Sequence, residues 1–134
     1  MSGSWRIVLA VVLGAHGIGH ILFLVPSLGI AEWGQSTRSW LLTNLVGDGV
    51  ARAVGSLLWL VAIVGFVSVG IGFVGVEGWW RALAVGSAAV SLLGLVLFWS
   101  SAAGSSAFAP ALFDVAVLVA ILVLHWPPSP VSGP

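Results

Sequence analysis

Two histidines, His16 and His20, are the residues of this chain whose types and spacing most clearly suggest chemistry. They stand in the middle of the first long apolar run. Residues four apart lie on one face of a helix, so both imidazoles point the same way. Ionisable residues within apolar membrane segments are costly and often mark ligand sites or proton pathways. Their chemistry depends on which other polar groups can reach them.

Asp114 and Arg52 are the charged residues that the layout of the chain could bring to these histidines. If the first and last apolar runs cross one bilayer in opposite directions, Asp114 lies at a depth similar to that of His20. Arg52 opens the second run on the same side. We therefore expect a ligand-binding pocket of His16, His20, Asp114 and Arg52, in which His20 approaches Asp114.

Three other interpretations of these residues are open. The simplest is structural, with hydrogen bonds across helix interfaces and Asp114 paired with Arg52 near the headgroups. A metal site would use His16, His20 and Asp114, a two-histidine, one-carboxylate set that suits non-haem iron and could also serve zinc or copper. A proton relay is the third, because histidine titrates near physiological pH. No cofactor and no catalytic residue follows from the sequence.

The composition indicates a membrane protein. Of 134 residues, 60% are hydrophobic and 6% are charged, with a mean hydropathy of +1.19. Soluble domains carry about 25% charged residues, so a soluble globule of this composition could not cover its surface with polar groups. The net charge is zero and no basic patch exists, which argues against nucleic-acid binding. The absence of cysteine excludes disulfides and zinc–cysteine sites.

Four apolar runs are long enough to cross, or nearly cross, a hydrocarbon core of about 30 Å. Only helices satisfy their own backbone groups in lipid, so we expect spans near residues 5–25, 50–76, 81–100 and 109–126. The predicted fold is an all-α transmembrane four-helix bundle, forming a single integral membrane domain over residues 1–134. A short interfacial helix is expected within residues 39–46, between the first two spans.

The sequence after the first run bears on where the helix ends and on whether the run is a cleaved signal peptide. We expect Pro26 to end the first helix, because proline lacks the backbone N–H that a helix uses. No Ala-x-Ala site follows the run, so we expect a retained span rather than a cleaved signal peptide.

The tryptophans support this layout, because seven of the eight fall near the ends of the runs and only Trp59 lies within one. Aromatic residues favour the two membrane interfaces, which predicts four spans with both termini on one side. The arginines do not set the orientation. Arg6 and Arg81 fall on one side of the bilayer, and Arg38 and Arg52 fall on the other.

Small residues recur at spacings of three and four in the second and third runs. Such stripes let helix backbones approach closely in membranes. We expect the second span to pack through Gly65, Ser68 and Gly72 against Ser87, Ser91 or neighbouring helices.

Three short stretches, residues 15–23, 95–99 and 113–119, carry a resemblance. Together they resemble small bacterial four-span membrane proteins with an HGxxH first helix, and the chain is loosely similar to DoxX-like proteins. The resemblance implies a multi-pass protein of a bacterial inner (plasma) membrane with a four-helix fold. Some DoxX-like proteins are associated with quinone or thiosulfate oxidation, but no functional residue of theirs is matched here.

The function that we favour is non-enzymatic. The chain would bind an apolar ligand, or pack beside a larger membrane complex, through its buried His/Asp pocket. Its partners would be the lipid bilayer and either another membrane protein or a second copy of the chain. A metal- or quinone-linked membrane oxidoreductase subunit and a proton-coupled small transporter are the alternatives.

Overall fold

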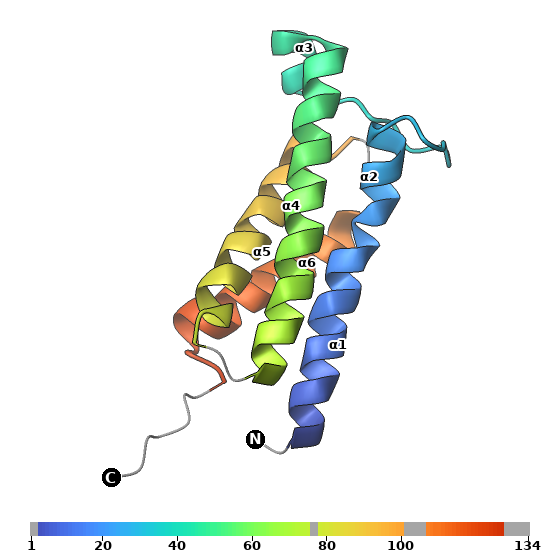
Figure 1. Ribbon diagram of the computed structural model, residues 1–134. Coiled ribbons are helices and arrows are strands. Elements are labelled where there is room, and N and C mark those ends of the chain that lie inside the picture. The colour runs from blue at the N-terminus through green and yellow to red at the C-terminus, as the bar shows by residue number, and fades with distance from the viewer. Residues whose placement is uncertain (1–2, 76–77, 101–106, 128–134) are drawn as a thin grey trace.

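The fold is all-helical over residues 3–75, 78–100 and 107–127, which are the residues that the computed structural model describes (Figure 1). No strand occurs among them, so the predicted all-α class is confirmed. The helical segments are α1 (Gly3–Gly19), α2 (Ile21–Ser27), α3 (Leu42–Val46), α4 (Asp48–Gly75), α5 (Trp80–Leu97), α6 (Phe108–Leu118) and a π-helical turn, η2 (Val119–Val123).

Three helices are long and apolar enough to cross a membrane: Gly3–Ser27, which joins α1 and α2, then α4 and α5. The fourth apolar run forms the shorter helix Phe108–Val123. It ends before Trp126, where a span over residues 109–126 was expected. The membrane class indicated by composition is thus supported by three of the four expected helices.

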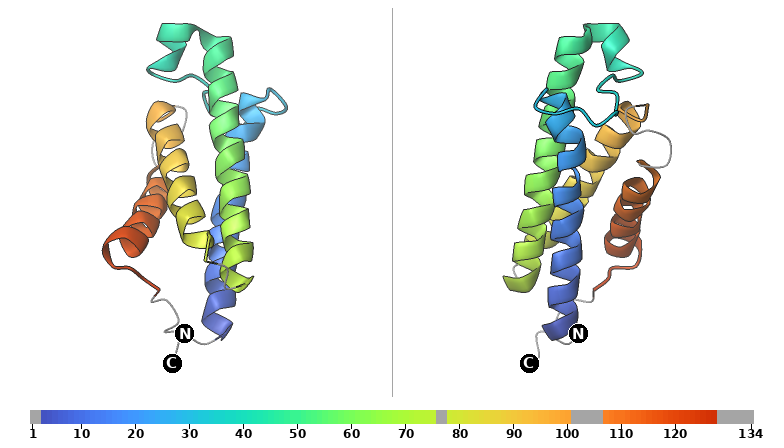
Figure 2. Two further views of the ribbon diagram at one scale, coloured as in Figure 1. Left: turned by 60° about the vertical axis from the view of Figure 1, so that its left-hand side comes forward. Right: turned by 90° about the vertical axis from the view of Figure 1, so that its right-hand side faces the viewer.

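The helices pack in chain order. Helix α1 packs on α4, α4 on α5, and α5 on α6, while α2 and α3 also lie against α4 (Figure 2). Helix α6 runs obliquely to the others. Aromatic and aliphatic side chains fill the interior, with Trp59, Leu95 and Phe98 at most 2% exposed.

The first span does not end at Pro26, as the sequence predicted. Helix α2 continues through Pro26 to Ser27. Proline cannot donate to the carbonyl four residues earlier, which belongs to Leu22. The indole N–H of Trp33 donates to that carbonyl instead, over 2.8 Å. The loop after α2 therefore supplies the hydrogen bond that the proline removes.

The glycine stripe of α4 makes the expected contact at one position and a different one at another. A Cβ atom added at Gly65 would collide with the Ser87 hydroxyl, so α4 and α5 approach closely here, as predicted. Gly72 instead faces the ring of Trp79, and not Ser87 or Ser91, the two partners that the sequence analysis named. Trp79 precedes α5 and folds back over the end of α4, which occupies the space beside Gly72.

Three arginines bind backbone carbonyls, two of them near the ends of neighbouring helices and the third in the segment that follows η2. Arg6 donates to Phe73 O over 2.7 Å, near the end of α4. Arg52 donates to Ser27 O over 3.2 Å, at the end of α2, and Arg81 donates to Pro127 O. Cations at helix C-termini satisfy unpaired carbonyls and complement the helix dipole. These charges therefore have a structural use.

Candidate functional site

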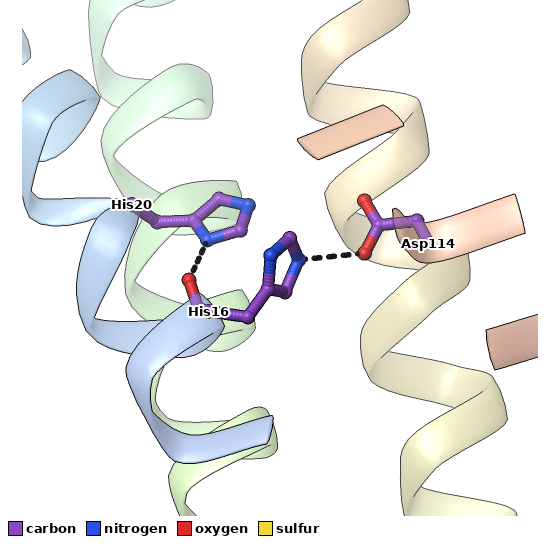
Figure 3. Close-up of side chains that lie close together, drawn as sticks. All are labelled: His16, His20 and Asp114. Atoms are coloured by element: carbon purple, nitrogen blue, oxygen red, sulfur yellow. Dashed lines mark hydrogen bonds and ion pairs between the residues drawn. The ribbon is translucent and has the colours of Figure 1, made fainter. Parts of the chain in front are cut away.

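His16 and His20 face the interior of the bundle, as the sequence predicted (Figure 3). His16 Nε2 lies 2.8 Å from Asp114 Oδ1, which joins α1 to α6. The His16 ring stacks on Phe113, with centroids 4.1 Å apart, and meets Phe66 edge-on. Aromatic rings from two other helices therefore fix the plane of this imidazole.

His20 is held by a break in the first span. Its backbone N–H donates to Gly17 O over 3.1 Å, a tighter turn than the α-helical bond to His16 O. The His16 carbonyl is therefore free to accept from the ring, and His20 Nδ1 lies 3.0 Å from it (Figure 3). His20 Nε2 lies 2.7 Å from Ser91 Oγ on α5.

Ser91 joins the two halves of the cluster. Its hydroxyl lies 2.5 Å from Asp114 Oδ2, so one hydrogen-bonded path runs from His16 through Asp114 and Ser91 to His20. His20, Ser91 and Asp114 are each at most 1% exposed. We call these four residues the histidine cluster. Sequence reasoning counted Ser91 as a packing residue, and its spacing alone could not show that its hydroxyl meets a histidine.

His20 approaches Asp114, as the sequence predicted, because a ring nitrogen of His20 lies within 4.8 Å of a carboxylate oxygen of Asp114. The direct hydrogen bond to Asp114 comes from His16, and Ser91 bridges His20 to the carboxylate. The predicted place of Arg52 in the site is wrong. Arg52 is not part of the cluster and does not pair with Asp114, because its guanidinium binds the carbonyls of Pro26 and Ser27.

The four contacts of the cluster require four hydrogens. His20 Nδ1 must donate, because a carbonyl only accepts. Two neutral imidazoles and one hydroxyl supply three hydrogens, and an ionised carboxylate supplies none. One further proton, on Asp114 or as a second proton on His20, completes the set and leaves the cluster neutral overall. In either arrangement His16 Nε2 carries a hydrogen and donates to Asp114, which leaves His16 Nδ1 as an acceptor.

His16, His20 and Asp114 offer donor atoms that lie within 4.8 Å of one another. Ligand atoms around zinc stand about 2.0–2.2 Å from the ion, hence roughly 3–4 Å apart. The set could close on a metal with small side-chain movements. The same atoms here bond to one another and to Ser91, so an ion would replace those hydrogen bonds.

A groove of about 400 Å³ lies beside the cluster, between the first span and α6. We call it the histidine groove. His16, His20 and Phe23 line one side, Pro110 and Phe113 line the other, and Gln35 of the loop after α2 completes it. A second cavity, of about 180 Å³, also reaches Phe113 and is lined by apolar side chains of α1, α5 and α6. Sequence reasoning did not single out Phe113 or Gln35.

Comparison with protein-family models, with curated proteins and with solved structures finds no match for this chain. The resemblance to DoxX-like proteins therefore stays a prediction.

Proposed function

We propose that this chain is a four-span protein of a bacterial inner membrane that binds an apolar, membrane-soluble ligand in the histidine groove. The observation that carries the proposal is the position of the cluster. Two histidines, held by Asp114 and Ser91, line a groove whose other walls are mainly apolar. Small-molecule sites are typically pockets of about 300–1,000 Å³ with mainly apolar walls and a few fixed polar groups.

The cost of the cluster supports a ligand-binding role over a purely structural one. Every polar group of a buried network needs a hydrogen-bond partner, because an unpaired group is costly. Replacing such a network with apolar residues of similar volume often leaves a protein equally stable. The cluster joins α1, α5 and α6, yet the space between the first span and α6 is open at the histidine groove. A network serving only to close the bundle has no need of that opening.

The fourth crossing is part of the same proposal. Helix Phe108–Val123 has 16 residues, hence about 24 Å at 1.5 Å per residue, which is short for a hydrocarbon core of about 30 Å. Its pairing with α1 through His16 and Asp114 supports placing it within the bilayer beside the three longer helices. The short helix α3, at the start of α4, would then lie at the interface (Figure 1).

A test of ligand binding uses a glycine that lines the groove. A Cβ at Gly19 meets nothing within 4 Å, so Gly19→Leu should fold and fill part of the histidine groove. Gly86→Leu is the control, because Gly86 on α5 is equally free of neighbours and lies outside the described cavities. Native mass spectrometry of protein purified in mild detergent should show a bound lipid-soluble molecule in wild type and Gly86→Leu. Equal binding by the Gly19→Leu variant would contradict the proposal.

A metal-linked redox subunit is the second candidate, favoured by the donor atoms that lie within 4.8 Å of one another. Metal analysis of the same preparations separates it from the first. About one equivalent of iron, zinc or copper in wild type, lost in His16→Gln, would favour the metal site. Metal-free protein that retains the lipid-soluble molecule would favour the ligand site.

A further inference from the structure

Gln35 carries an unsatisfied buried atom at the wall of the histidine groove. Its Oε1 is buried and has no hydrogen-bond partner among the described residues. Buried polar atoms in folded proteins are almost always paired, so an unpaired one calls for a partner from outside the chain. A carbonyl oxygen only accepts, and the missing partner must therefore be a donor.

The loop that carries Gln35 is anchored on both sides of it. Before it, the Trp33 indole donates to Leu22 O over 2.8 Å. After it, the Ser39 hydroxyl donates to Leu97 O over 2.6 Å, and the Trp40 indole donates to Val96 O over 2.7 Å. These bonds tie the loop to α2 and α5. Gln35 is therefore held at the groove by its neighbours and not by a bond of its own amide oxygen.

The histidine groove offers a second acceptor. His16 Nε2 donates to Asp114 in the neutral cluster, and His16 Nδ1 has no partner within the described part of the chain. His20 offers nothing further, because both of its ring nitrogens are engaged. The polar side chains that line the groove thus carry two acceptors without a partner among the described residues, on Gln35 and His16, besides the Gln35 amide hydrogens.

The lining of the groove holds no Asp, Glu, Lys or Arg. A charged head group would therefore enter without a counter-ion, which is costly in an apolar setting. Gln35 also lines a cavity of about 10 Å³, which is too small for any head group, so the groove is the described cavity from which a ligand can reach Gln35. The walls around Phe23 and Phe113 suit a hydrocarbon chain.

From these observations we infer that the ligand is an uncharged amphiphile with a hydroxyl head group and a hydrocarbon chain, of the long-chain alcohol class. Its hydroxyl donates to Gln35 Oε1, and His16 Nδ1 is the alternative acceptor in the same groove. The inference rests on the proposed function, and it adds the chemical class of the ligand.

The test compares two probes with the same hydrocarbon chain, in which a methyl group replaces the hydroxyl hydrogen of one. Radiolabelled 1-hexadecanol is bound to detergent-purified protein, and unlabelled 1-hexadecanol or hexadecyl methyl ether competes for it. The ether keeps the chain and an oxygen but has no hydrogen to donate. A net hydrogen bond contributes about 0.5–1.5 kcal/mol, so the ether should compete about two- to thirteenfold less well. The Gln35→Leu variant should reduce that preference, whereas Asn44→Leu, an exposed amide on α3, should keep it.

The outcomes separate the inference from the proposed function. If alcohol and ether compete equally in wild type and Gly19→Leu abolishes the binding of both, the groove binds ligands but the hydroxyl class is wrong. A preference for the alcohol that Gln35→Leu leaves unchanged would also overturn the role of Gln35. If neither probe binds, or if Gly19→Leu has no effect on binding, both the inference and the proposed function fail.

Discussion

At the scale of single residues, the histidine cluster depends on the hydroxyl of Ser91. Ser91 contacts His20 Nε2 and Asp114 Oδ2, so each of these buried atoms has Ser91 as its partner. Ser91 also places Asp114 in the orientation that meets His16 on the other carboxylate oxygen. A side chain of similar size without the hydroxyl would keep the packing and leave both atoms unpaired.

Ser91→Ala should therefore destabilise the protein by about 1–3 kcal/mol, the range for leaving a buried polar group unsatisfied. Ser87→Ala is the matched control, one turn earlier on α5, because Ser87 is buried but makes none of the cluster's hydrogen bonds. The free energy of unfolding, measured by denaturant titration in mixed micelles, gives the comparison. Equal stabilities of the two variants would show that the cluster contributes nothing beyond packing.

What the sequence could show at this scale was the shared face of His16 and His20, because a four-residue spacing fixes it. The interior position of Asp114 followed from the cost of an ionisable group facing lipid. The pairing did not follow, since the tilt of α6 and the turn at His20 set which histidine meets which partner. Gln35 gave no signal, because it stands in an irregular loop without a periodic pattern.

At the scale of the helices, glycine residues allow α4 to approach its neighbours closely. The stripe of small residues in α4 predicted such approach, and Gly65 confirms it against Ser87. Spacing could not identify each partner, because Trp79 lies outside the regular helix and still packs on Gly72.

Gly65→Leu should destabilise the protein by about 1–3 kcal/mol through overpacking. Gly86→Leu is the control, because it makes the same substitution on a helix where the new side chain meets open space. Both variants gain the same helix propensity, so a difference in their stabilities reports the collision at Gly65. Thermal unfolding in detergent measures both. A Gly65→Leu variant as stable as Gly86→Leu would mean that α4 and α5 do not approach at this point.

The order of packing at the scale of the whole molecule leaves the histidine groove between the first span and α6. Composition and run lengths predicted the membrane class and the helical regions, because both follow from the bilayer's thickness and low polarity. The groove could not be predicted, because the lengths of the apolar runs do not give the course of α6 relative to the first span. Figure 2 shows how the helices are arranged.

The four crossings that we propose would place both ends of the bundle on one side. Because the chain lacks cysteine, single cysteines can be introduced without background. Cysteines at Ser4 and at the exposed His125 should react with a membrane-impermeant maleimide from the same side, and one at Ser36 from the other. Reaction of Ser4 and His125 positions from opposite sides would overturn the four-span topology.

The most direct measurement of the central claim is photo-labelling with a diazirine-bearing hexadecanol in proteoliposomes, with peptide mapping by mass spectrometry. Leu22, which lines the histidine groove, and Leu57, on α4 outside the described cavities, are 55% and 61% exposed. Non-specific lipid contact should label both about equally. We predict excess labelling at Leu22 and around Phe113, removed by unlabelled 1-hexadecanol and by Gly19→Leu. Equal labelling at Leu22 and Leu57, insensitive to the competitor, would contradict a ligand site in the histidine groove.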